Sequence, residues 1–153
     1  LRNGYWGRAV LRDRQGEHAQ ATKDWDLAIA VQEKMEDDPG HELTMLRLFR
    51  SASEVAGGKD PAAAVSRARN LSIAQRSRWG PNLAAAQVFA RAAAGGQGQA
   101  GAWAAEAVAS LQRAHTSGYF VTKAQVRQLE LDPAWKPLLA REDFQQFKRS
   151  LNP

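Results

Sequence analysis

The pattern that decides the fold starts in residues 21–28, which read ATKDWDLA. Ala21, Trp25 and Ala28 are spaced by four and then three residues, so they share one face of an α-helix. The same spacing returns twice at intervals of 43 residues, in the triplets Ala64, Ala68, Leu71 and Ala107, Leu111, Ala114. Recurrence at a fixed interval predicts a repeated structural unit. An irregular helical bundle is the alternative, because alanine is frequent enough here for some matches to arise by chance.

The repeated unit is expected to be a helix hairpin. Each triplet follows a glycine-containing turn, at Gly16, at 57–58 or at Gly101. Each of these turns follows an expected helix that has a small residue near its middle, at Ala9, Ala52 or Ala86. Small residues at such positions let the two helices of a hairpin approach closely. We therefore expect an all-α solenoid built from three helix hairpins.

Turn and capping residues set the expected helix boundaries. Asp60 is a good N-cap, and Pro61 suits the first helical position because its missing N–H is not needed there. The pair at 80–81, Gly-Pro, is expected to break the chain, and Gly118 to end a helix. Helices are expected over 17–35, 41–56, from 61 onward, 82–94 and 102–116. A single domain then has hairpins over about 2–36, 41–78 and 82–117, and a C-terminal helical cap over about 121–152.

The composition supports a helical chain. Its 153 residues include 29 alanines but only ten valines and isoleucines, and alanine favours helices whereas β-branched residues favour strands. The absence of cysteine excludes disulfides, zinc–thiolate sites and a cysteine nucleophile. No apolar run approaches the roughly 20 residues that cross a bilayer, so we expect a cytoplasmic protein without membrane contact. Because the chain starts at Leu1 rather than Met, we also expect it to be a fragment.

A short motif marks the first hairpin: YWGRA at 5–9, then Gly16, Ala21, the pair DW at 24–25, and Ala28. This combination resembles a tetratricopeptide repeat (TPR). In that family an arginine beside a small residue marks the first helix, and an Asp–aromatic pair marks the second. Arg12 and Glu33 depart from the family pattern, which usually has an aromatic residue and a proline there. The resemblance implies a right-handed TPR-like solenoid that binds a protein or peptide on its concave face.

The C-terminal third carries a second set of motifs, LQRA at 111–114, GY at 118–119, LDP at 131–133, PL at 137–138 and DFQQF at 143–147. These resemble the end of TPR regions in planctomycete-type bacterial proteins, many of which are Ser/Thr kinases with the kinase domain upstream. The resemblance implies an alternative function, as the regulatory or substrate-docking region of a larger bacterial signalling protein.

Motifs for catalysis and cofactors are weak. Residues 96–101, GQGQAG, fit the dinucleotide pattern G-x-G-x-x-G, but they follow an expected helix rather than a strand. The three histidines, His18, His41 and His115, lie in different helical segments and form no metal-binding pair. A Gly-x-Ser-x-Gly elbow is also missing. We therefore expect no enzymatic activity, no cofactor and no metal.

The net charge of +5 is concentrated in the middle of the chain. Residues 61–105 contain no acidic residue and five arginines, Arg67, Arg69, Arg76, Arg78 and Arg91. A solvated outer face is the simplest interpretation. An acidic protein partner and a nucleic acid are the alternatives, and nucleic acid is disfavoured because interleaved aromatic residues and a denser basic stripe are missing.

The remaining large apolar residues are assigned to the core and to the cap. Trp25, Trp103 and Trp135 are expected in the core. The cap is expected to begin at 132–133 and to pack on the last hairpin through Trp135, Leu138, Leu139, Phe144, Phe147 and Leu151.

Aligning the hairpins predicts a binding face. The first helix of each hairpin should present its side chains to the concave side, whereas the second helices, with most of the arginines, should form the convex side. The candidate partner-binding residues are Trp6, Asp13, Phe49, Ser53, Gln87 and Arg91. This mixture of aromatic, acidic, basic and neutral polar groups suits an extended peptide or a partner helix better than a polyanion.

Overall fold

The computed structural model describes residues 2–35, 40–95 and 98–151. Every regular element in these ranges is helical, so the prediction of an all-α fold is confirmed. The helices are α1 (Arg2–Arg14), α2 (His18–Met35), α3 (His41–Ala56), α4 (Pro61–Ile73), α5 (Trp79–Gly95), α6 (Ala100–Thr116), α7 (Lys123–Leu131), the 3₁₀ helix η1 (Pro133–Leu138) and α8 (Glu142–Ser150). The expected turn at 37–40 and part of the GQGQAG motif lie outside the described residues.

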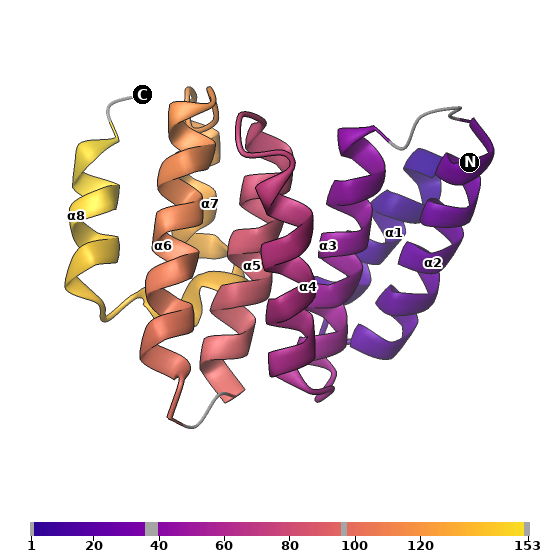
Figure 1. Cartoon of the computed structure of the whole chain (residues 1–153), viewed down its shortest axis with the longest axis horizontal. Helices are drawn as coiled ribbons and strands as arrows, with labels where there is room; N and C mark the ends of the chain where they lie inside the picture. Colours follow the sequence, from indigo (N-terminus) through magenta and orange to yellow (C-terminus); the bar gives the residue numbers. More distant parts are fainter. Residues whose placement is uncertain (1, 36–39, 96–97, 152–153) are drawn as a thin grey trace.

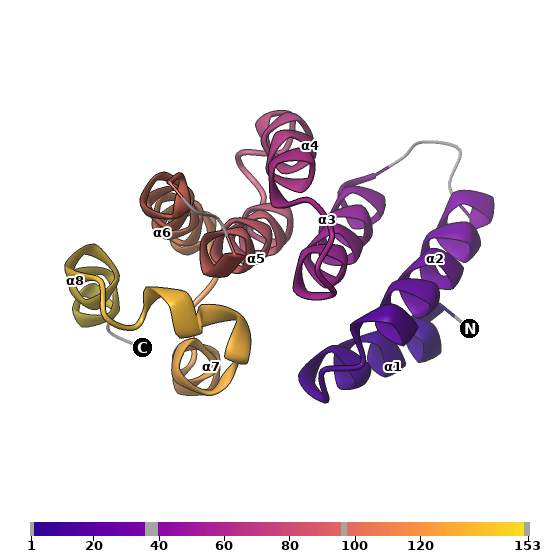
Figure 2. The ribbon, with the colours of Figure 1, turned by 90° about the horizontal axis from the view of Figure 1, so that it is seen from below.

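Consecutive helices stand side by side along the molecule (Figure 1). The closest packing is between α1 and α2, α2 and α3, α3 and α5, and α5 and α6, while α4 packs on both α3 and α5. Seen along the helices, α4 and α6 lie on one side of α3 and α5, and α7 lies on the other, the side that α1 also borders (Figure 2). We call the first side the outer face and the second the groove face.

The alanines that define the predicted repeat are all buried. Ala21, Ala64 and Ala107 have at most 1% of their surface exposed. The small residues predicted to lie opposite them, Ala9, Ala52 and Ala86, are buried as well. Tight helix pairs of this kind are what alanine at a contact position permits.

The core has two parts. The larger one runs from α3 to α8 and includes Phe89, Trp103 and Trp135. The smaller one joins the first hairpin to α3 through Trp25 and Leu46. The three tryptophans expected in the core, at 25, 103 and 135, are all at least 96% buried, which confirms that prediction.

The capping signals act as expected at the second hairpin. The carboxylate of Asp60 accepts a hydrogen bond from the Ala62 N–H at 2.9 Å, and Pro61 is the first residue of α4. Gly58 follows the end of α3 with a φ of +89°, a conformation that glycine adopts without steric cost.

The expected break at 80–81 is wrong, because α5 begins at Trp79 and includes both residues in its first turn. Proline is tolerated there since the first N–H groups of a helix have no intrahelical acceptor. The buried amide of Asn82 secures this start by donating to the carbonyls of Arg76 and Arg78 at 2.8 and 2.7 Å. A Cβ on Gly80 would lie 2.8 Å from Met45 Sδ, so glycine also allows α5 to approach α3 closely.

The C-terminal elements pack on the last hairpin. α8 contacts α6, and η1 contacts α5. Of the six residues assigned to the apolar side of the cap, five are buried, but Leu139 is 39% exposed. Leu139 directly follows η1, as the residue that ends this short helix, and there its side chain turns to solvent.

Candidate functional site

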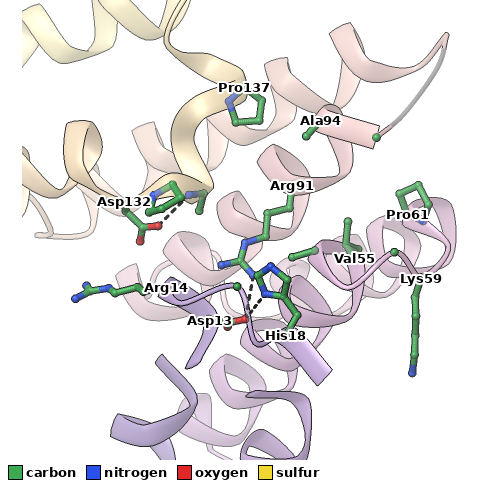
Figure 3. Close-up of a pocket in the computed structure, with 16 residues that line it drawn as sticks. Asp13, Arg14, His18, Val55, Lys59, Pro61, Arg91, Ala94, Asp132 and Pro137 are labelled. Atoms are coloured by element: carbon green, nitrogen blue, oxygen red, sulfur yellow. Dashed lines mark hydrogen bonds and ion pairs between the residues drawn. The ribbon is translucent and has the colours of Figure 1, made fainter. Parts of the chain in front are cut away.

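A groove runs between α1, α3 and α5 on one side and α7 and η1 on the other. At the end formed by the α1–α2 and α3–α4 turns it opens into a cavity of about 570 Å³ (Figure 3). A narrower part of about 180 Å³ continues along α7. Four residues line both parts, namely Asp13, Arg14, Arg91 and Asp132.

Asp13 lies at the centre of a network of polar contacts in this site. Its Oδ1 lies 2.9 Å from Nδ1 of His18, and its Oδ2 accepts a hydrogen bond from Ser53 Oγ at 2.5 Å. The indole N–H of Trp25 donates to Ser53 Oγ at 2.9 Å and lies 3.4 Å from Asp13 Oδ2. Arg91 Nη1 is 3.5 Å from Asp13 Oδ1. Side chains of α2, α3 and α5 therefore meet at one carboxylate of α1, and both of its oxygens have partners within the protein.

Arg91 retains unused hydrogen-bonding capacity. Only 13% of its side chain is exposed, and its buried Nη1 has no hydrogen bond among the described residues. Figure 3 shows its guanidinium reaching from α5 to Asp13 and His18 at the wall of the cavity. Because Nη1 is buried and forms an ion pair with Asp13, a ligand in the groove would contact the other nitrogens of this guanidinium.

The carboxylate of Asp132 also has hydrogen-bond partners within the protein. Its Oδ1 accepts from the Ala134 N–H at 2.9 Å, which caps η1, and Gln87 Nε2 lies 3.4 Å from its Oδ2. Because Asp13 and Asp132 are both used internally, the free groups of the groove are mainly donors. Arg14 adds another donor at the rim of the groove, where its Nη2 is 3.4 Å from Gln128 Oε1 on α7.

The narrower part of the groove is aromatic. Phe49 stacks on Trp25 with ring centroids 5.4 Å apart, and it borders this part of the groove. Tyr119 borders it as well and stacks on Trp79 at 4.9 Å. Burial, and the nearby Asp132 carboxylate, raise the pKa of Tyr119 above its usual value, so it is a neutral hydroxyl at physiological pH.

The six predicted binding residues have different positions. Asp13, Phe49, Gln87 and Arg91 line the groove. Ser53 is fully buried and serves to hold Asp13, so it does not face a ligand. Trp6 packs on Trp25 and Phe49, and lines a separate hollow of about 320 Å³ between the beginnings of α3 and α5.

Sequence reasoning missed the contribution of the cap to the groove. Asp132, Gln128 and Tyr119 come from the C-terminal segment, and no periodicity connects them to the first helices. The contact between His18 and Asp13 could have been predicted, since the two residues are five positions apart across the turn at Gly16.

The arginines of the middle segment are mostly paired. Arg67 bonds to Glu54 at 3.1 Å, Arg69 holds Glu106 through two nitrogens, and Arg78 contacts His41. Burial alone would raise the pKa of Glu54, but Lys59, Arg50 and Arg67 outweigh it and lower that pKa below its usual value.

In the part of the chain that the structure describes, no three His, Asp or Glu side chains are grouped so that they could hold a metal ion. Among the same residues, no helix has both the length and the apolar character needed to cross a membrane. The described end of the GQGQAG motif leads directly into α6, and the motif follows the helix α5.

Comparison of the chain with family models, with curated proteins and with solved structures finds no match.

Proposed function

We propose that this chain is a non-catalytic protein-interaction domain that binds an extended segment of a partner protein in the groove. The observation that carries the proposal is the groove itself, which Phe49, Gln87 and Arg91 line on one wall and Tyr119 and Gln128 line on the other. The fold in this proposal is a TPR-like right-handed solenoid of three hairpins, α1–α2, α3–α4 and α5–α6, with α7, η1 and α8 as the cap.

The groove suits an extended peptide chemically. Phe49 and Tyr119 offer flat apolar surface to a side chain, while Gln87 and Arg91 offer donors to a backbone carbonyl or a carboxylate. In such an interface a few residues supply most of the affinity, and these are usually aromatic residues and arginine. Among the described residues, the one hydrogen bond of Gln87 Nε2 is the long contact of 3.4 Å to Asp132, which a ligand could replace.

The pairing of the arginines supports a peptide over a nucleic acid. A polyanion needs several free cations on one surface, yet Arg67 and Arg69 form ion pairs with Glu54 and Glu106. Arg91 lies on the groove face, away from the arginines of α4.

The test uses peptides selected from a random display library against the full chain. We expect a selected peptide to bind wild type in the micromolar range or better, and Arg91→Ala or Phe49→Ala to weaken it at least about tenfold. Gln87→Ala, which removes no buried contact of the core, should weaken it more modestly. Isothermal titration calorimetry measures each affinity, with a thermal melt of every variant to confirm folding.

The matched control is the double variant Arg69→Ala/Arg76→Ala on the outer face, which should bind the same peptide as wild type does. Loss of binding in that variant, with Arg91→Ala and Phe49→Ala unaffected, would show that the groove is not the binding site. A peptide whose affinity falls by orders of magnitude between low and moderate salt would indicate a polyelectrolyte interaction instead.

A further inference from the structure

A second hollow lies on the outer face, between α4 and α6, with Phe89 of α5 at its base. Its volume is about 300 Å³, and three arginines line it, Arg69, Arg76 and Arg113. Figure 2 shows that α4 and α6 stand on the opposite side of α5 from α7, so this hollow is separate from the groove. Glu106 is the one acidic residue among those that line it.

Glu106 does not compensate all three cations. Both of its oxygens are bound by Arg69, through Nε at 2.9 Å and Nη2 at 2.5 Å. This bidentate pair is the geometry in which arginine and a carboxylate neutralise each other most fully. Neither Arg76 nor Arg113 forms an ion pair with a described residue, although the charge of Glu106 still acts on Arg113.

Arg113 is fixed in place by neutral partners. Its Nε donates to Asn82 Oδ1 at 3.1 Å and its Nη2 to Ser110 Oγ at 2.7 Å, which leaves Nη1 without a hydrogen bond among the described residues. Asn82 is itself held by the carbonyls of Arg76 and Arg78. The guanidinium is thus preorganised before any ligand arrives, which reduces the entropy lost on binding.

Arg76 supplies the second free cation. Its side chain is exposed and makes no hydrogen bond or ion pair with any described residue. Burial and then the charge of Arg76 lower the pKa of Arg113 from its usual value, and the charge of Glu106 partly opposes them. The two guanidiniums that line the hollow therefore repel each other. An anion between them would relieve that repulsion.

We infer that the hollow between α4 and α6 is a binding site for a single phosphate monoester group, held by Arg76 and Arg113. Two guanidiniums, Arg76 in the turn after α4 and Arg113 in α6, together offer several N–H donors, and a monoester provides three acceptor oxygens and a charge of about −1.5 to −2 at pH 7. A carboxylate provides fewer oxygens and half that charge. Ile73, which is 55% exposed at the rim, offers apolar contact to the organic group that carries the phosphate.

The test is a titration of the full chain at constant ionic strength with inorganic phosphate, phenyl phosphate, dimethyl phosphate and acetate. We expect saturable binding of the first two, with phenyl phosphate tighter because it also contacts Ile73, and little binding of the diester or acetate. Arg76→Gln should weaken phenyl phosphate binding at least about tenfold. Arg113→Lys, which keeps the charge but loses the fork, should weaken it as well.

The matched control is Arg67→Gln, which removes an arginine of α4 that is already paired with Glu54. It should bind phenyl phosphate within about twofold of wild type. Equal losses in the Arg67 and Arg76 variants would overturn the site in favour of diffuse charge, and so would the absence of binding up to about 50 mM ligand. Tighter binding of a single-stranded RNA, with a steep salt dependence, would assign the surface to nucleic acid instead. These variants leave the groove intact, so their outcome is independent of peptide binding there.

Discussion

Asp13 of α1 and Ser53 of α3 are joined by a hydrogen bond of 2.5 Å, although 40 positions separate them in the chain. The first hairpin packs on α3 mainly through α2, and this bond adds a direct polar link from α1. Ser53 is fully buried and also receives the indole N–H of Trp25. The bond therefore fixes the Asp13 carboxylate, and with it the position of Arg91 at the groove.

Replacing Ser53 by alanine should destabilise the fold. The change leaves the Trp25 N–H and Asp13 Oδ2 without their best partner in a buried position, which costs about 1–3 kcal/mol of the free energy of unfolding. Urea denaturation monitored by circular dichroism measures the loss. The matched control, Ser66→Ala, alters an exposed serine of α4 and should change stability by less than about 0.5 kcal/mol. Equal stability of the Ser53 variant and wild type would mean that the bond contributes nothing net.

Stability should fall in acid through Asp24. This carboxylate is buried and accepts hydrogen bonds from Arg8 at 2.6 and 2.8 Å and from Arg12 at 2.8 Å, and the bond from Arg8 is the main reason that its pKa lies below the usual value. A lowered folded-state pKa means that the stabilisation is complete above the unfolded-state pKa, about 4, and is lost as pH falls through the lower folded-state value.

Urea denaturation of wild type and Asp24→Asn at pH 7, 5 and 3 checks this dependence. The difference in unfolding free energy should be about 1.5–3 kcal/mol at pH 7 and should shrink at pH 3. Glu33→Gln on the same helix is the control, because its partner Arg47 and Glu33 itself are both about half exposed and such pairs contribute little. A difference that stays constant from pH 7 to pH 3 would rule out ionisation of Asp24 as its source.

The cap should contribute directly to stability through Phe144. Its side chain is fully buried at the start of α8, and α8 packs on α6. Phe144→Ala should cost about 3–5 kcal/mol, because it removes a large buried apolar group and leaves a cavity. A thermal melt compares it with Gln146→Ala, an exposed position of the same helix. Unchanged stability after deletion of residues 132–153 would contradict a capping role.

The repeat spacing can be tested at Ala107. Its side chain is fully buried, in line with the position of Ala21 and Ala64 in the other hairpins. Ala107→Leu should overpack the interface and cost about 1–3 kcal/mol in a thermal melt. Ala105→Leu makes the same change at an exposed position of α6 and should be nearly neutral. A variant at 107 as stable as wild type would show that this position is not a close helix contact.

The helices were predictable where local chemistry decides them. α3 spans the range expected from its flanking glycines, and Asp60 and Pro61 start α4 as their capping preferences indicate. The start of α5 was not predictable, because a Gly-Pro pair usually marks a break. Here the side chain of Asn82 reaches back to two carbonyls of the preceding loop, a tertiary arrangement that no propensity encodes.

The groove was predictable in part. Asp13, Phe49, Gln87 and Arg91 follow from the alignment of the first helices, since helical periodicity assigns residues to faces. The wall formed by α7 and η1 could not be predicted from that alignment. The direction of the chain between α6 and α7 depends on Gly118 and Phe120, both of which have positive φ. Ser53 is buried because α1 lies close to α3. The distance between two helices cannot be read from the periodicity of either one.

The groove joins segments from opposite ends of the chain, because Arg14 of α1 in one wall lies beside Gln128 of α7 in the other, 114 positions away. A ligand that contacts both walls binds only while α7 and η1 are docked, so it must raise the free energy of local opening of this segment. Amide hydrogens in residues 123–138 should then exchange with solvent more slowly in proportion to ligand occupancy, whereas amides of α4 keep their rates. Hydrogen exchange thus turns the C-terminal segment into a reporter for partners of the groove that requires no labelled ligand.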